Sequence, residues 1–166
     1  MTTVILSKNC LNSLPSGAES TVFCADIGTS SLKAALVSKD GTVAAFSQQP
    51  FQLDTAADGD ISSAGKNASA RIDSSGIARQ WLPALERAAQ EFGIKMQTVQ
   101  ALCISGNGPT IVSENGTTLL WNDTVPDSIA AIPSHSLFTP RIAAFKAIFP
   151  AEWNKSKYIF SGPEYI

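Results

Sequence analysis

The stretch DIGTSSLK, residues 26–33, decides the expected fold because it places a carboxylate, a glycine, three hydroxyls and an ammonium side by side. It begins at the end of an apolar, β-prone run over residues 21–27. An ionised Asp26 is costly there unless a cation or hydrogen bonds compensate it. Turn N–H groups, hydroxyls and an ammonium are the parts of phosphate-binding loops, and a neighbouring carboxylate can hold hydrated Mg²⁺. The same residues could instead form a plain surface hairpin.

Two further β-prone runs follow this stretch, over residues 32–38 and 42–49. They are separated by Asp40-Gly41, a dipeptide that favours a hairpin turn because glycine accepts positive φ. Pro50 halts the last run. This punctuation predicts three consecutive antiparallel strands over 21–27, 32–38 and 42–49.

Helices and strands are then predicted in alternation. Residues 1–20 are polar and lack a period, so we expect an irregular lead-in before a domain over 21–166. A helix is predicted within 74–92, with Pro83 kinking it or delaying its start. We also predict a loop over 50–73, a strand over 99–105, a hairpin over 110–121 and a strand over 158–160. Between the last two, a helix is expected that is capped by Thr139 and opened by Pro140. Its inward residues would be Ile142, Phe145, Ile148 and Phe149. The order indicates an α/β fold with a mixed sheet and flanking helices.

Composition limits the classes of function. The 166 residues are 44% apolar and 16% charged, which fits one folded domain. A net charge of −2 and a pI of 5.3 give no basic surface, so we expect no nucleic-acid partner. We find no signal peptide and no apolar run of about 18 residues, so we expect no membrane partner and a cytoplasmic location. Cys10, Cys24 and Cys103 are odd in number and lack metal-site spacing, and two of them lie in apolar runs, which favours buried thiols in a reducing compartment.

Four segments, in order, resemble motifs of the FGGY carbohydrate kinases, which belong to the actin, hexokinase and Hsp70 superfamily. Residues 26–37 with Asp40-Gly41 resemble the family's first phosphate motif. Residues 104–107 (ISGN) resemble a strand-end motif in which Ser-Gly-Gln is common. Residues 120–124 (LWNDT) resemble a Trp-x-Asp-x-Arg segment, and 137–160 are similar to the helix and strand that follow. The resemblance implies a ribonuclease H-like, actin-like ATPase domain over roughly residues 21–166.

The resemblance also implies roles for the first motif. Asp26 would lie near the Mg²⁺ of bound Mg-ATP. Gly28 would let the backbone approach the nucleotide. The hydroxyls would hydrogen-bond the β- and γ-phosphates, and the ammonium would be the basic phosphate contact; these residues are Thr29, Ser30, Ser31 and Lys33. Such roles suit phosphoryl transfer, where catalysis is mainly positioning and charge stabilisation.

The substrate side departs from the family's pattern. Asn107 keeps an amide that could recognise a hydroxyl of a sugar or polyol. Asp123 could contact the same substrate or only stabilise a turn. Gly108 and Pro109 stand where the family usually has polar substrate contacts, and Val125 replaces the arginine of Trp-x-Asp-x-Arg.

The family's second domain binds adenosine, and its catalytic aspartate lies beyond the matched region. We therefore expect the N-terminal part of an ATP-dependent carbohydrate kinase, with no catalytic residue of its own and inactive alone; a separate C-terminal half is a candidate partner. The alternative is a non-catalytic remnant or interaction module that a partner chain completes. A ribonuclease H-like nuclease also begins with a strand aspartate, but it needs further carboxylates at neighbouring strand ends. Residues 105–107 (SGN) supply none.

Overall fold

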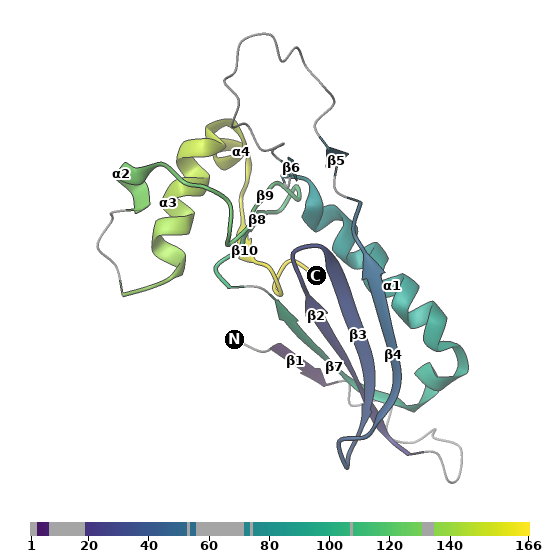
Figure 1. Ribbon diagram of the computed structural model, residues 1–166. Helices are drawn as coiled ribbons and strands as arrows, with labels where there is room; N and C mark the ends of the chain where they lie inside the picture. The colour runs from purple at the N-terminus through teal and green to yellow at the C-terminus, as the bar shows by residue number, and fades with distance from the viewer. Residues whose placement is uncertain are drawn as a thin grey trace.

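The computed structural model describes residues 3–6, 19–52, 54–55, 72–73, 75–106, 108–130 and 135–166. Its main feature is a five-stranded sheet with the strand order β1-β7-β2-β3-β4 (Figure 1). The strands are β1 (Thr3–Leu6), β2 (Thr21–Ile27), β3 (Ser31–Ser38), β4 (Val43–Pro50) and β7 (Val99–Gly106). Strands β2 and β7 are parallel, and the other neighbouring pairs are antiparallel. The mixed sheet and the three consecutive antiparallel strands, β2 to β4, are confirmed.

The β3–β4 hairpin forms where Asp40-Gly41 predicted it. Gly41 adopts a φ of +90°, which favours glycine. One carboxylate oxygen of Asp40 accepts hydrogen bonds from Ser38 Oγ at 2.5 Å and from the Thr42 N–H at 2.9 Å. These bonds lower the pKa of Asp40, because they favour its ionised form.

The expectation of an irregular segment over residues 1–20 is wrong for Thr3–Leu6. These residues form β1, which pairs antiparallel with β7 so that Thr3 faces Ile104 and Leu6 faces Ala101. A run of three large apolar residues is too short to predict a strand alone. The edge of β7 supplies the missing information, because its N–H and C=O groups need partners.

One face of the five-stranded sheet is covered by α1 (Trp81–Phe92), which follows the 3₁₀ turn η2 (Ile77–Gln80). Pro83 lies in the first turn of α1, where its missing N–H is tolerated, so the delayed helix start is confirmed. The 3₁₀ segment η3 (Gly93–Thr98) then leads into β7. The core between helix and sheet includes Phe23, Ala25, Ile27, Leu32, Ala34, Leu36, Trp81, Ala84, Ala88 and Phe92.

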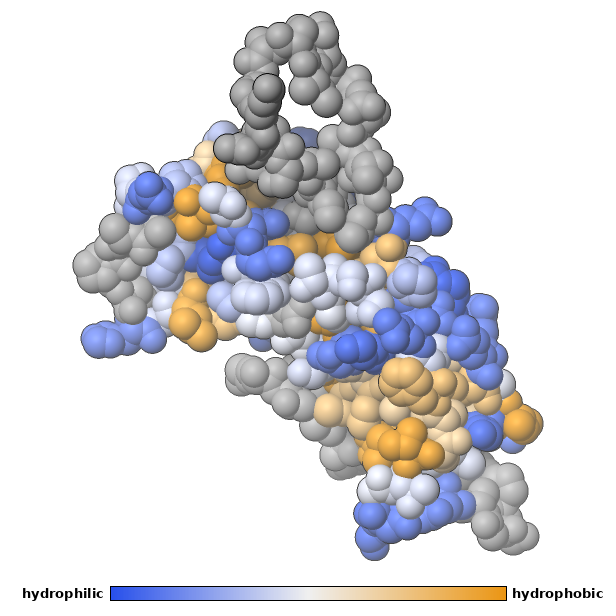
Figure 2. Space-filling model, in the orientation of Figure 1, coloured by the Kyte–Doolittle hydropathy of each residue, from blue (hydrophilic) through white to orange (hydrophobic). Residues whose placement is uncertain are grey.

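The opposite face of this sheet carries the alternate residues of the same strands. Cys24, Ala35 and Phe46 are register partners in one row across β2, β3 and β4. Phe46 is 61% exposed. Figure 2 shows hydrophobic side chains gathered over this part of the sheet. Within the described part of the chain, α1 is the helix that packs on the sheet, and it lies on the other face.

A second, smaller layer contains a three-stranded sheet of order β10-β8-β9. Its strands are β8 (Ile111–Ser113), β9 (Thr118–Leu119) and β10 (Ile159–Ser161), which confirms the predicted hairpin and final strand. The helices nearby are α2 (Asp127–Ala130), α3 (Phe138–Ile148) and α4 (Pro150–Lys155). Ile111 and Leu119 pack with Ala144 and Phe145 of α3 in a second hydrophobic cluster. The short strands β5 (Asp54–Thr55) and β6 (Ile72–Asp73) pair, while the rest of the predicted loop lies mostly outside the described residues.

The helix predicted from Thr139 onward begins earlier and is rotated. Helix α3 starts at Phe138 without a side-chain cap from its N-cap residue, so Thr139 lies inside the first turn. Arg141 is buried, whereas Ile142 and Ile148 are 37% and 38% exposed. The predicted inward positions of these two isoleucines are wrong, because the buried face of the helix contains Arg141, whose Nη1 donates to the Asp123 carbonyl oxygen at 2.9 Å. None of the described helices has the length and apolarity that a membrane span needs.

Candidate functional site

The predicted phosphate turn connects β2 to β3. The Gly28 N–H donates to the Ser31 carbonyl oxygen at 2.9 Å, and Thr29 and Ser30 lie at the tip. A Cβ on Gly28 would lie only 2.8 Å from that carbonyl oxygen, so a larger residue would force the turn to move. Glycine is therefore needed here for close backbone approach within the turn itself.

Asp26 and Lys33 lie opposite each other at the ends of β2 and β3. Both side chains are exposed, and alternation along the strands places them on the face away from α1. Asp26 is also the register partner of Ser105 at the end of β7. A carboxylate, an ammonium and a hydroxyl thus meet at one edge of the sheet.

Ser31 differs from the other hydroxyl residues of the turn. It is 6% exposed, and its Oγ accepts a hydrogen bond from Gln48 Nε2 at 3.2 Å. Ser30, in contrast, is exposed and Thr29 is half-buried. The Ser31 side chain therefore joins the turn to β4, while the tip of the turn presents the other two hydroxyls.

Trp121 connects a distant segment to the same turn. Its indole Nε1 donates to Thr29 Oγ1 at 3.4 Å, and its backbone N–H donates to Thr110 Oγ1 at 3.2 Å. A Cβ on Gly108 would lie 3.4 Å from Trp121 Cβ. The glycine turn after β7 and the segment after β9 therefore converge on the first turn. The sequence indicated Trp121 only as part of a motif and gave no sign of this contact.

A small cavity lies directly behind the first turn. Its wall brings together the ends of β2 and β7, the start of α1 and the C-terminal turn, and is lined by Ile27, Gly28, Trp81, Gly106, Thr110, Leu120 and Gly162. A Cβ on Gly106 would lie 3.2 Å from Pro163 Cγ. The C-terminal residues therefore pack onto Gly106 at the end of β7, where the second glycine turn begins. The sequence alone did not predict this contact.

Of the two predicted substrate residues, one lies in the described part of the chain. Asn107 lies outside the described residues. Asp123 stabilises its own turn, because its Oδ2 accepts a hydrogen bond from the Leu120 N–H at 2.7 Å. The Asp123 carbonyl oxygen accepts one from Arg141 Nη1 at 2.9 Å. Val125, at the position where the family has arginine, packs against the second hydrophobic cluster.

Arg141 is a structural residue that no sequence motif indicated. It is 8% exposed, and burial lowers its pKa while the charge of Asp123 opposes that shift. The signal that could have found it is the helical period, which places residues 141, 144 and 145 on one face once the helix starts at Phe138. A buried cation thus anchors α3 to the turn that contains Trp121.

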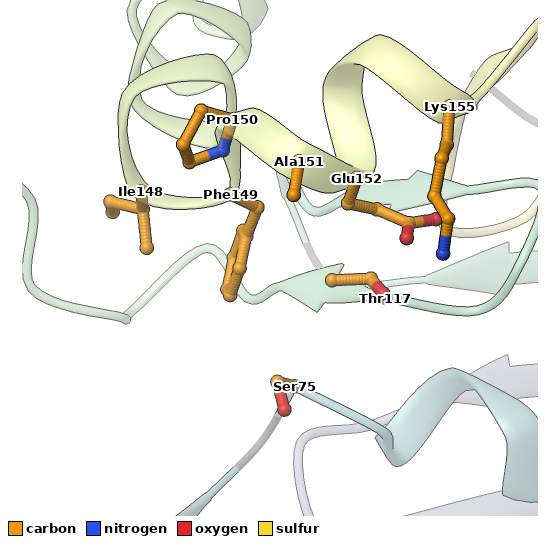
Figure 3. Close-up of a pocket in the computed structure, with 8 residues that line it drawn as sticks. All are labelled: Ser75, Thr117, Ile148, Phe149, Pro150, Ala151, Glu152 and Lys155. Carbon is orange, nitrogen blue, oxygen red and sulfur yellow. The ribbon is translucent and has the colours of Figure 1, made fainter.

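A larger cavity, about 410 Å³, lies between α4 and the β8–β9 hairpin. Figure 3 shows Glu152 and Lys155 pointing from α4 toward Thr117, with Ser75 across from them. Glu152 Oε1 accepts hydrogen bonds from Asn115 Nδ2 at 2.8 Å and Ser113 Oγ at 2.7 Å, and these bonds lower its pKa. The residues lining this cavity include none of the predicted site residues, so it is separate from the first turn. Among the described residues there is also no group of three histidine, cysteine, aspartate or glutamate side chains arranged to hold a metal.

Several solved structures of carbohydrate kinases have a similar fold. The chain is similar to a gluconate kinase from Lactobacillus acidophilus, with a TM-score of 0.62, 13% identity and coverage of 89% of this chain and 32% of that chain. A xylulose kinase from Rhodospirillum rubrum has a TM-score of 0.59 and 19% identity, with coverage of 87% of this chain and 33% of that chain. A glycerol kinase from Plasmodium falciparum with ADP has a TM-score of 0.59 and 10% identity, with coverage of 89% of this chain and 33% of that chain.

The chain therefore has the fold of the N-terminal domain of sugar kinases, with a mixed sheet and flanking helices, as the sequence motifs predicted. It spans about a third of the length of these similar chains. No protein-family model and no curated protein matches the sequence.

Proposed function

We propose that this chain is the N-terminal, phosphate-binding part of an ATP-dependent carbohydrate kinase, and that it does not transfer phosphate alone. One observation carries the proposal: Asp26, Lys33 and the 28–31 turn meet at one edge of the sheet, where Trp121 contacts Thr29. A phosphate group needs such a set of hydroxyls and a cation around a close backbone approach. The motif resemblance and the kinase fold support the same function.

The residues at this edge fit Mg-ATP by their chemistry. Gly28 keeps the turn narrow, as the 2.8 Å approach of a Cβ to the Ser31 carbonyl demonstrates. The exposed Asp26 carboxylate would hold the hydrated Mg²⁺. Thr29 and Ser30 would donate hydroxyl hydrogen bonds to the phosphates, and Lys33 would attract their charge. When bound, Mg²⁺ neutralises charge that develops on the phosphate oxygens.

Ser31 has a supporting role in this proposal. Its buried hydroxyl accepts the Gln48 amide, so it fixes the turn against β4. We assign the direct hydroxyl contacts to the two residues at the tip, and Ser31 contributes through its backbone, which closes the turn with Gly28.

The substrate would be a sugar or polyol that offers a hydroxyl to the γ-phosphate. The similar solved structures are kinases named for gluconate, xylulose and glycerol. We propose that Asn107 and Asp123 contact the substrate. Their amide and carboxylate suit hydroxyl recognition. The rest of the cleft would come from a further domain, because the chain matches a third of the kinases' length. We propose a cytoplasmic location for the assembly.

A second candidate function is an interaction module that a partner chain completes without catalysis. The observation that favours it is the hydrophobic sheet face opposite α1, where Phe46 is 61% exposed; Val43 on the same strand is 58% exposed. Isolated exposed apolar residues are ordinary, but a contiguous patch marks an interaction surface. Nucleotide binding distinguishes the two candidates.

Isothermal titration of the purified chain with Mg-ATP tests the first proposal. The variants are Asp26→Ala and Thr29→Ala, and Glu86→Gln on the exposed side of α1 is the matched control. We expect binding that both site variants weaken and the control preserves, with circular dichroism showing that all four proteins are folded. Absence of binding at millimolar nucleotide, or equal binding by all variants, would favour the interaction module.

A further inference from the structure

Cys24 and Cys103 lie beside each other in the centre of the five-stranded sheet. They are register partners on the parallel strands β2 and β7. Both are free thiols of intermediate exposure. Their neighbours Phe23, Ala25 and Ile104 are buried against α1, so alternation places both thiols on the opposite face. Within the described part of the chain, this is the face without a packed helix.

The strand geometry suits a covalent bond between the two sulfurs. Neighbouring strands lie about 4.8 Å apart, and Cα atoms of disulfide-bonded cysteines lie about 4.4–6.8 Å apart. Register partners on parallel strands also project from the same face. Burial and, to a lesser degree, the neighbouring Cys103 raise the pKa of Cys24.

We propose that Cys24 and Cys103 form a reversible disulfide by exchange with a low-molecular-weight disulfide such as oxidised glutathione. One cysteine thiolate attacks a sulfur of the oxidant, whose S–S bond breaks and releases one small thiol. The second thiolate then attacks the protein sulfur of this mixed disulfide, forms the Cys24–Cys103 bond and expels the second small thiol. The protein loses two protons and two electrons, and the oxidant becomes two thiols.

The same geometry makes this bond easy to reduce. Cβ atoms of a relaxed disulfide lie about 3.8 Å apart, which is less than the spacing of about 4.8 Å between strands. The bond would therefore pull β2 and β7 together, and strained, accessible disulfides have the more oxidising potentials. We expect the dithiol in a reducing compartment and the disulfide under oxidising conditions.

On each strand, the proposed bond lies two residues before the end that carries the candidate phosphate site. Asp26 follows Cys24 by two residues, Ser105 follows Cys103 by two, and the two later residues are register partners as well. Oxidation would thus tie together the two strands that position the first turn and the second glycine turn. The cysteine chemistry itself is independent of the kinase proposal and is tested without nucleotide.

The test uses Cys10→Ser protein, in which only these two thiols remain, kept folded and treated with oxidised glutathione. We expect the loss of two free thiols per chain, a monomer lighter by two hydrogens, no retained glutathione, and full reversal by dithiothreitol. A peptide that joins Cys24 to Cys103 in digests of the unsubstituted protein checks that the Cys10 substitution did not create the pairing. The rate should rise with pH because the thiolate is the attacking species.

The matched controls are the double variants Cys10→Ser/Cys24→Ser and Cys10→Ser/Cys103→Ser. Each retains one thiol and should keep bound glutathione, because no second thiol can expel it. The proposal is overturned if the two-thiol protein keeps glutathione on both cysteines, forms dimers in place of the internal bond, or reacts only after denaturation in urea.

Discussion

Trp121 donates a hydrogen bond from its indole Nε1 to Thr29 Oγ1 at 3.4 Å, although the two residues are 92 positions apart in sequence. The bond connects the segment after β9 to the tip of the turn between β2 and β3. Trp121 is 48% exposed, so its ring borders both the turn and solvent. This arrangement provides a spectroscopic probe of the proposed phosphate site.

Mg-ATP should change the fluorescence of Trp121. A nucleotide on the 28–31 turn would displace water from the exposed indole, so we expect emission at shorter wavelength on titration. The variant Trp121→Phe should lose this change while the buried Trp81 continues to fluoresce. Its free energy of unfolding should differ from that of the wild type by no more than about 0.5 kcal/mol, as for most surface substitutions. A nucleotide-dependent signal that persists in Trp121→Phe would place the binding site elsewhere.

Gly28→Ala should destabilise the protein. The new Cβ would lie 2.8 Å from the Ser31 carbonyl oxygen, so the turn must open. We expect the free energy of unfolding in urea to fall by about 1–3 kcal/mol, the usual cost of an overpacked site. The matched control is Gly76→Ala, where φ is −109° and the nearest atom to the Cβ is Arg79 Nη1 at 3.8 Å, an ordinary contact distance. That change should be neutral or stabilising by up to about 1 kcal/mol; equal losses in both variants would contradict the steric argument.

The sequence predicted the parts of the fold that local signals specify. Alternating apolar residues and the Asp40-Gly41 turn determine β2 to β4, since both the face and the register follow from them. The strand β1 escaped prediction because it depends on the edge of β7, a long-range partner. The rotation of α3 escaped prediction because buried Arg141 replaces an apolar residue in the helical pattern.

The candidate site was predictable only in its first segment. Asp26 to Lys33 are continuous in sequence, and a strand-turn-strand signal brings them together without tertiary information. The Trp121–Thr29 contact and the packing of Pro163 on Gly106 join segments far apart in the chain. No composition or period encodes such contacts, so they emerge only from the folded structure.

Glu152 should make stability depend on pH in the acid range. Its Oε1 accepts hydrogen bonds from Asn115, Ser113 and Ser156, which lower its pKa in the folded protein. A lowered folded pKa contributes stability above the unfolded pKa, about 4.3, and this contribution is lost as the pH falls through the folded pKa. Urea unfolding near pH 7 should therefore show wild type more stable than Glu152→Gln. The difference should shrink as the pH falls below the usual glutamate pKa and toward the lowered pKa of the folded protein.

The control for this pH effect is Glu86→Gln on the exposed side of α1. Its stability should parallel that of the wild type across the same range. If Glu152→Gln and wild type kept a constant difference down to the lowest pH, the hydrogen bonds to Glu152 would not depend on its charge, and the assignment would fail.

The start of α3 separates two possible caps. The sequence favoured Thr139, but the structure places it inside the helix, and the Phe138 N–H donates to Ser136 Oγ at 3.2 Å. We expect Thr139→Ala to change the free energy of unfolding by less than about 0.5 kcal/mol. Ser136→Ala should cost about 0.5–1.5 kcal/mol, the range for one lost intramolecular hydrogen bond. Thermal unfolding followed by circular dichroism measures both, and the reverse order would restore Thr139 as the cap.

Arg141 should be the residue that anchors α3 to the Trp121 turn. Its Nη1 donates to the Asp123 carbonyl oxygen at 2.9 Å, while Nε and Nη2 are buried without a hydrogen-bond partner among the described residues. Arg141→Ala removes the donor and the packed stem, so we expect a loss of about 1–3 kcal/mol in urea unfolding, typical of leaving a buried acceptor unsatisfied. Arg141→Met also removes the donor, but it keeps most of the stem and abolishes the cost of burying the charge. It should therefore be more stable than Arg141→Ala. Trp121 fluorescence should change in both variants if the turn loosens, and an unaltered spectrum in both would show that Arg141 stabilises the helix without positioning the turn.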